Sequence, residues 1–107
     1  MTDPAPLVAH RGYQRNFPEN TLLAYQQAIR AGARYIETDI QLSADGVPFL
    51  YHDEEMTRIS AVTGLFHTYS ADALRKFSAS EPSRFGDKFE NTPITSLTEL
   101  CQLLATH

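Results

Sequence analysis

The sequence contains one cysteine, Cys101, no apolar run near the roughly 20 residues of a membrane span, and no excess of basic residues. A lone cysteine excludes a disulfide framework within the chain and fits a reducing compartment. The opening stretch MTDPAPLVAHRG lacks the basic segment and apolar run of a signal peptide. The net charge is −4 with both signs interspersed, which indicates neither a nucleic-acid partner nor a membrane surface. These absences predict a soluble protein of the cytoplasm.

What is present is typical of a globular domain. Hydrophobic residues make up 42% of the chain and charged residues make up 21%. A length of 107 residues allows one domain with a single core and is too short for two ordinary domains.

Residues 7–42 predict a strand, a helix and a second strand. The apolar run at 7–10 forms the first strand, and residues 35–42 form the second. Between them Asn20 is placed as the helix N-cap and Gly32 as the left-handed residue after the helix end. The apolar face of this helix consists of Leu22, Tyr25 and Ile29. Such a βαβ unit implies parallel strands joined by a right-handed crossover, and hence an α/β fold.

The dipeptide DG at 45–46 is a turn signal that leads into a second apolar run at 47–52. If these are the two loop residues of a hairpin, the register can be counted from them, with a stagger of one residue allowed. The opposed pairs are then Asp39 with His52 and Gln41 with Tyr51. Residues 47–52 could instead run parallel to the strand at 35–42 without an intervening helix, which would also bring His52 to the strand ends. We favour the local hairpin, although a strictly wound barrel would require parallel strands.

Residues 54–93 are mostly polar and are interpreted as an insertion, with one short helix at about 71–77 capped by Ser70. The chain closes with a helix at about 96–106, where Ser96 and Glu99 make a capping box. Its apolar face consists of Leu97, Leu100, Cys101 and Leu104. Because a face this well defined needs a sheet to cover, the sequence is expected to be the first part of a larger α/β domain.

Two carboxylates, Glu37 and Asp39, lie two residues apart on the predicted second strand. Side chains alternate along a strand, so the two share one face, with their Cα atoms roughly 6–7 Å apart. The opposite face, toward the helix layer, is expected to carry Ile36, Thr38, Ile40 and Leu42. Two such carboxylates stay ionised readily only beside a cation or water, and hard oxygen ligands on a strand suit Mg²⁺ or Ca²⁺. The alternative is a solvated edge with ordinary acidic residues.

His10 and His52 each end an apolar run at a strand terminus, where α/β proteins gather their active sites. A lone histidine there is more often a surface or hydrogen-bonded residue, but a pair beside carboxylates can divide acid and base roles at neutral pH. Arg11 adds donors suited to phosphate, although an arginine beside a turn glycine is often only solvated. With a divalent cation, these groups are the ones needed to cleave a phosphoester.

A set of short motifs occurs in the order and spacing of a known family. The motifs are HRG at 10–12, PENT at 18–21, AGA at 31–33, IETD at 36–39, DG at 45–46 and HD at 52–53. Arg58, Gly64 and the stretch TPITSLTEL at 92–100 extend the match over nearly the whole chain. In these features the sequence resembles the glycerophosphodiester phosphodiesterase family.

The resemblance implies a (β/α)8 TIM barrel of the phospholipase C-like phosphodiesterase type. Residues 1–107 would be its N-terminal portion, with the barrel start at 6–53 and an insertion after the third strand. It also implies a metal-dependent hydrolase of lipid and glycerol metabolism, which cleaves small glycerophosphodiesters to glycerol 3-phosphate and an alcohol. The matching motifs assign acid–base roles to His10 and His52, ligation of Mg²⁺ or Ca²⁺ to Glu37 and Asp39, and phosphate binding to Arg11.

Four neighbouring residues carry no such assignment. Glu19 and Asn20 line the same rim of strand ends, where Asn20 is expected to cap the helix and Glu19 to favour its positive end. Asp53 either orients His52 or begins the next loop. His67, in the insertion, matches no motif and is expected to face solvent.

The chain departs from the family in its length, because a barrel of this kind needs roughly 250 residues. Members also supply a third acidic metal ligand, with a lysine two residues on, from a strand that would begin past His107. Two other functions therefore stay open: a phospholipase-D-like or cyclising phosphodiesterase, whose members are usually secreted and disulfide-bearing, and a catalytically incomplete fragment. A truncated chain would expose a strand edge and an apolar face, so we expect it to self-associate.

Overall fold

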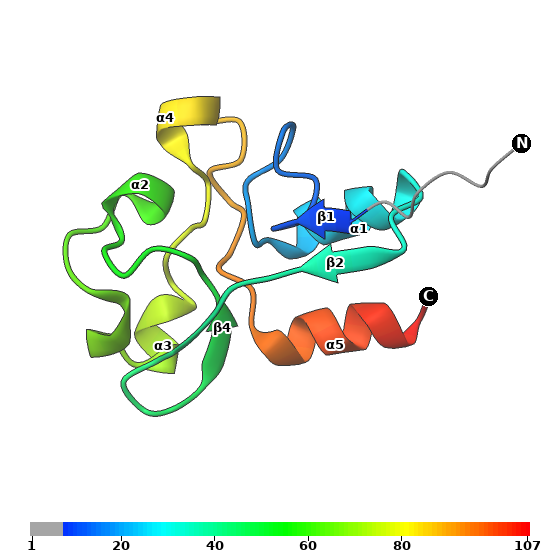
Figure 1. Cartoon of the computed structure of the whole chain (residues 1–107). Helices are drawn as coiled ribbons and strands as arrows, with labels where there is room; N and C mark the ends of the chain where they lie inside the picture. The colour runs from blue at the N-terminus through cyan, green and yellow to red at the C-terminus, as the bar shows by residue number, and fades with distance from the viewer. Residues whose placement is uncertain (1–7) are drawn as a thin grey trace, which may run out of the picture.

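The computed structural model describes residues 8–107 (Figure 1). The opening stretch, with the first residues of the predicted strand and barrel start, lies outside the described residues. The elements in chain order are β1 (Val8–His10), α1 (Leu22–Arg30), β2 (Tyr35–Glu37), β3 (Ile40–Leu42), β4 (Pro48–Leu50), α2 (Thr57–Ser60), the 3₁₀ helix η1 (Phe66–Thr68), α3 (Ala71–Leu74), α4 (Pro82–Phe85) and α5 (Leu97–Ala105). Figure 1 shows α2, α3 and α4 gathered at one end of the molecule, with β1, β2, α1 and α5 at the other. In the described part of the chain, no helix has the length and apolar character needed to cross a membrane.

The strands β1 and β2 pair in parallel, as the βαβ pattern predicts, and their register sets His10 opposite Glu37. The helix between them begins one residue later than predicted. Its N-cap is Thr21, whose hydroxyl accepts a hydrogen bond from a backbone N–H in the first turn. Asn20 adopts a left-handed backbone, with φ of 56°, and its side chain is used elsewhere. Gly32 has the predicted left-handed conformation after the helix end, with φ of 95°.

The predicted strand at 35–42 is wrong as a continuous element, because it is interrupted at Thr38 and Asp39. The first part, β2, belongs to the sheet with β1, and the second part, β3, pairs antiparallel with β4 in a separate hairpin. At the interruption, the Thr38 hydroxyl and the Asp39 N–H both donate to the Asn20 side-chain oxygen, at 3.2 and 3.4 Å. A side chain therefore replaces a neighbouring strand as the hydrogen-bond partner, and the chain changes sheets there.

The local hairpin is confirmed, with a different register from the one predicted. Gln41 pairs with Phe49 rather than Tyr51, and the Tyr51 N–H donates to the Asp39 carbonyl at 2.9 Å. The turn is longer than a two-residue loop, because the Ser43 N–H closes it on the Val47 carbonyl. The extra loop residue moves the partner of each β3 residue along β4.

The expectation that one strand face would cover the helix layer holds for Ile36 and fails for Ile40 and Leu42. The side chain of Ile36 packs beside Leu50 and Leu100, whereas Ile40 is 48% exposed and Leu42 is 55% exposed. The physical reason is the change of sheet, which carries β3 away from α1. On the parallel pair, Val8 and Tyr35 lie opposite each other and are 60% and 59% exposed. These apolar surfaces motivate the self-association expected above, which stays a prediction.

Most of the larger buried cluster lies in the region that the sequence predicted to be an insertion. The main cluster consists of Phe49, Tyr51, Met56, Ile59, Phe66, Ala71, Leu74, Ala79 and Ile94. Within it the Tyr51 and Phe66 rings stack, with centroids 4.6 Å apart. Residues 54–93 therefore contribute to the packed framework, which corrects the expectation that they stand apart from it; their status as an insertion between barrel elements stays a prediction.

For the helices, the predicted N-caps of α3 and α5 agree with the structure better than the predicted buried faces of α1 and α5 do. Ser70 caps α3 and Ser96 forms the capping box with Glu99, both as predicted. α3 ends at Leu74, earlier than the predicted 77. On α5, Leu100 is buried and packs with half-buried Leu97 and Leu103, while Cys101 and Leu104 are exposed. On α1, Tyr25 is fully buried, with Leu22 and Ile29 only half-buried.

Candidate active site

The ends of β1 and β2 bring His10 and Glu37 together. His10 Nε2 lies 3.3 Å from Glu37 Oε2, and His10 Nδ1 lies 2.8 Å from the side-chain amide of Gln14. The Oε2 atom is itself buried and, although His10 Nε2 lies within ion-pair distance, it accepts no hydrogen bond from any described residue. Because a buried carboxylate oxygen without a hydrogen bond is costly, this atom has the capacity for a further partner.

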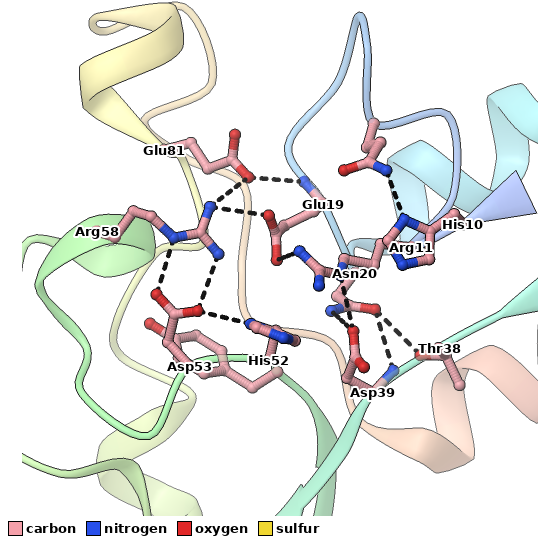
Figure 2. Close-up of polar contacts among 12 residues, drawn as sticks. His10, Arg11, Glu19, Asn20, Thr38, Asp39, His52, Asp53, Arg58 and Glu81 are labelled. Carbon is pink, nitrogen blue, oxygen red and sulfur yellow. Dashed lines mark hydrogen bonds and ion pairs between the residues drawn. The ribbon is translucent and has the colours of Figure 1, made fainter.

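Asp39 lies against Arg11 and Asn20 (Figure 2). Its Oδ2 lies 3.1 Å from Arg11 Nε and accepts a hydrogen bond of 3.1 Å from the Asn20 amide. The Asn20 oxygen lies 3.0 Å from the hydroxyl of Tyr25, which is also 2.9 Å from the Glu37 carbonyl. Burial raises the pKa of the Tyr25 phenol, so this hydroxyl stays a donor at neutral pH. The Asn20 side chain thus fixes Asp39 and the strand interruption together.

Glu19 is 4% exposed and binds two arginines. Its Oε1 accepts a 2.9 Å hydrogen bond from Arg58 Nη1, and its Oε2 accepts one of 3.4 Å from Arg11 Nη1. Burial raises the pKa of the Glu19 carboxyl, but the hydrogen bond and charge of Arg58, with smaller contributions from Glu81 and Arg11, outweigh burial. The net pKa is lowered, so Glu19 is an ionised, buried link between the two arginines.

His52 follows β4, and the backbone on either side of it is held by hydrogen bonds from Gln41. Gln41 donates its side-chain amide to the carbonyls of Tyr51 and Asp53, at 3.1 and 2.7 Å. The His52 Nδ1 lies 2.7 Å from Asp53 Oδ1, and the other ring nitrogen faces the side of the group where Asp39 and Arg11 lie (Figure 2). Of the two interpretations of Asp53, the structure therefore supports the one in which it orients His52.

These contacts divide the predicted site into pairs. Glu37 meets His10 as predicted, whereas Asp39 meets Arg11 and no direct contact joins either carboxylate to His52 within residues 8–107. Among the described residues, no group of three or more His, Cys, Asp and Glu side chains is arranged to hold a metal ion. The hard oxygen donors and the unpaired Glu37 Oε2 fit a divalent cation, but this chain would supply only part of its ligands.

Comparison with known families shows which family the chain belongs to. Residues 10–106 match the model of the Glycerophosphoryl diester phosphodiesterase family. The chain belongs to this family.

Relatives and solved structures within the family share most of this chain. A glycerophosphodiester phosphodiesterase from Caldanaerobacter subterraneus is 36% identical over 98 residues, covering 92% of the chain and 40% of the relative. The crystal structure of glycerophosphodiester phosphodiesterase from Agrobacterium tumefaciens has a TM-score of 0.88 and 33% identity, covering 96% of the chain and 44% of that structure. A phosphodiesterase from Oleispira antarctica, solved with the product sn-glycerol-3-phosphate, has a TM-score of 0.87 and 29% identity, covering 95% and 40%.

The glycerophosphodiester phosphodiesterase fold of these relatives confirms the predicted fold class. The chain spans less than half the length of the relatives it matches, and it has the architecture of the N-terminal portion of their TIM barrel. Strand ends at the carboxyl rim of such a barrel are where active sites are built.

The sequence did not reveal how several polar residues hold this candidate site. Asn20 and Glu19 were expected to line its rim with roles at the helix start, and the structure shows that both side chains point into the site. Arg58 and Glu81 come from the region interpreted as an insertion; Glu81 is 1% exposed and accepts a hydrogen bond from the Glu19 N–H. Arg58 already stood out as part of the motif set, but nothing local showed which carboxylates it would meet. His67 is exposed, as predicted.

Proposed function

We propose that the protein carrying this chain is a metal-dependent phosphoric diester hydrolase that cleaves glycerophosphodiesters to glycerol 3-phosphate and an alcohol. The observation that carries the proposal is the grouping of His10 with Glu37 and of Arg11 with Asp39, beside His52, at strand ends of a glycerophosphodiester phosphodiesterase fold. The family relatives bear this activity in their names, and a product-bound relative holds sn-glycerol-3-phosphate. The place of such a reaction would be lipid and glycerol metabolism.

Glu37 and Asp39 would hold Mg²⁺ or Ca²⁺, with further ligands from outside this chain. The unpaired Oε2 of Glu37 supports that role. A bound divalent cation would supply charge neutralisation at the substrate phosphate. On this chain alone we expect weak binding, because two carboxylates leave a Ca²⁺ ion, which takes about 6–8 oxygen ligands, mostly coordinated by water.

The two histidines would divide the proton transfers. His52 offers the ring nitrogen that is not bonded to Asp53, and this nitrogen faces the site (Figure 2). His10 offers Nε2, which lies beside Glu37 at the other strand end. One imidazole would take a proton from the nucleophile while the other gives a proton to the leaving alcohol.

Arg11 would bind the substrate phosphate through a donor that the protein leaves available. Its Nη1 bonds Glu19 and its Nε lies against Asp39, but no described residue accepts a hydrogen bond from Nη2. The side chain is only 19% exposed, so its charge is weakly screened. A planar guanidinium held on two sides presents its remaining N–H groups in a fixed direction, which suits phosphate oxygens.

The test is turnover of glycerophosphocholine with Mg²⁺ or Ca²⁺, with product identification by ³¹P NMR. The enzymes compared are the chain and a chimera joining it to the remaining barrel of the Agrobacterium tumefaciens relative. We expect glycerol 3-phosphate from the chimera and little turnover from the chain alone. In the chimera, His10→Ala and His52→Ala should each lower kcat toward the upper end of the roughly 10²–10⁴-fold range of acid–base catalysis.

The matched control is His67→Ala, because His67 is an exposed histidine of the same chain. Both site variants should keep nearly full metal affinity. Release of the metal from either variant would show that the histidine is a ligand. A cyclic phosphate product would assign the site to the cyclising phosphodiesterases, and a chimera without turnover would contradict the hydrolase proposal.

A further inference from the structure

The hydrogen bond between His52 and Asp53 fixes where the imidazole carries its proton. Arg58 grips the Asp53 carboxylate at two points, with Nε 2.8 Å from Oδ2 and Nη2 3.0 Å from Oδ1. The Arg58 hydrogen bonds are the largest cause that lowers the pKa of Asp53 to about 2, and His52 adds to the effect. Asp53 is therefore an ionised acceptor at neutral pH. Since an ionised carboxylate can only accept, the His52 nitrogen facing it must be the N–H.

Arg58 is itself held at both ends. Its Nη1 bonds the buried Glu19 at 2.9 Å and lies 3.9 Å from the buried Glu81. At the backbone, α2 is anchored by Ile59, which is 2% exposed, and by a 2.9 Å hydrogen bond between the Ser60 and Tyr51 hydroxyls. The guanidinium thus cannot turn away from Asp53 without breaking its ion pair with the buried Glu19.

The contacts form one chain of alternating charge across the site. From His52 it runs through Asp53, Arg58, Glu19 and Arg11 to Asp39. Figure 2 shows this chain as a nearly continuous line of dashes from one candidate acid–base residue to the neighbourhood of the candidate metal ligand. Its members come from segments far apart in the sequence, so the arrangement depends on the whole fold.

We propose that Asp53 and Arg58 are positioning residues that set the tautomer of His52. Arg58 fixes the Asp53 carboxylate, Asp53 accepts a hydrogen bond from His52 Nδ1–H, and Nε2 is left unprotonated and facing the site in the neutral ring. The use of Nε2 in catalysis rests on the proposed function. The tautomer itself does not, because it is a property of the folded polypeptide alone.

An Asp53→Ala substitution tests this role. Arg58 bonds both Asp53 oxygens, so an asparagine amide would face an arginine N–H in either orientation, whereas alanine removes the acceptor and adds no donor. Asp53 is the residue that bonds His52 Nδ1 among the described residues, so without its carboxylate the Nδ1–H form loses its partner and the ring should shift toward Nε2–H.

The experiment is ¹H–¹⁵N NMR of the full chain labelled at histidine, at a pH where the ring is neutral. We expect the Nδ1–H tautomer in the wild type and a shift toward the Nε2–H tautomer in Asp53→Ala. Asp72→Ala, the same change at an exposed aspartate bonded only to Arg75, should leave the tautomer unchanged. A wild type with Nε2–H or an unchanged Asp53→Ala spectrum would each overturn the proposal.

A second measurement tests Arg58 directly and covers an Asp53→Ala variant that fails to fold. Arg58→Lys keeps the positive charge and loses the two-point grip, so the His52 Nδ1 proton resonance should broaden. A resonance as sharp as in the wild type would remove Arg58 from the positioning role.

In an active enzyme, Asp53→Ala should lower kcat roughly 10²-fold with little change in KM. The two proposals can fail separately. An inactive enzyme with the expected tautomers would contradict only the proposed function, and an active enzyme with the wrong tautomer would contradict only the positioning pair.

Discussion

Replacing Glu19 by glutamine tests the buried charge that joins the two arginines. The substitution keeps the shape of the side chain and one carbonyl oxygen, and it turns the other oxygen into an NH₂ group. The stronger of the two contacts, 2.9 Å to Arg58, should keep the oxygen, so the NH₂ group faces Arg11 Nη1 at a distance of 3.4 Å. One charge-assisted hydrogen bond is lost, and two donors are left facing each other.

The magnitude follows from burial. A hydrogen bond to a charged group contributes about 1.5–3 kcal/mol, and Arg11 is only 19% exposed, so little water replaces the lost partner. Two effects oppose the loss: Arg58 is 44% exposed and can be hydrated, and removing the Glu19 charge relieves repulsion with the neighbouring Glu81. We therefore expect a decrease of about 2 kcal/mol in the free energy of unfolding, or roughly 10 °C in Tm for a domain of this size.

The assay is urea and thermal unfolding of the chain at neutral pH, followed by circular dichroism. Glu90→Gln is the matched control, because Glu90 is an exposed glutamate whose carboxylate makes no hydrogen bond or ion pair among the described residues. The control should stay within about 0.5 kcal/mol of the wild type. A Glu19→Gln variant as stable as the control would refute the idea that this carboxylate neutralises both arginines.

Three further predictions concern the backbone, the hydroxyl under the site and acid stability. Gly12→Ala should lower the free energy of unfolding by about 2–4 kcal/mol, because φ is 83° and the new Cβ would lie 2.7 Å from a side chain of α1. In the same unfolding assay Gly32→Ala, with φ of 95° and open space around the new Cβ, should lower it by about 1 kcal/mol. Tyr25→Phe should lower the unfolding free energy by about 1–2 kcal/mol and broaden the NMR signals of the strand interruption; full stability would show that the hydroxyl bonds are dispensable. Arg58 holds the pKa of Asp53 at about 2, below its ordinary 3.8. The stability that the ionised Asp53 contributes is therefore present above pH 4 and is lost as pH falls toward 2. Asp53→Asn should therefore lose less stability than the wild type between pH 5 and pH 2.5, and equal losses would contradict the ion pair.

Local signals were enough to predict many parts of this structure. The capping box of Ser96 and Glu99, the cap at Ser70 and the hairpin at 45–46 depend on neighbours within a few residues, and each is confirmed. The parallel pairing that sets His10 beside Glu37 follows from the βαβ pattern, which constrains strand direction strongly.

The parts that failed depend on contacts between distant residues. Asn20 and Thr21 are both good N-cap residues, and only the position of Asp39 shows why Asn20 leaves the cap to its neighbour. The interruption at Thr38 follows from the same amide. Arg58 finds Glu19 39 positions away, a pairing that no periodicity reveals.

The central claim is that Glu37 and Asp39 hold a divalent cation within reach of the two histidines. Mn²⁺ tests it directly, since it prefers the same oxygen ligands as Mg²⁺ and broadens NMR signals of nearby nuclei. Titrated into the labelled chain, Mn²⁺ should first broaden the signals of Glu37, Asp39, His10 and His52, and this selectivity should vanish in Glu37→Gln/Asp39→Asn. Broadening centred on an exposed acid such as Asp87, or the same pattern in the double variant, would contradict the site.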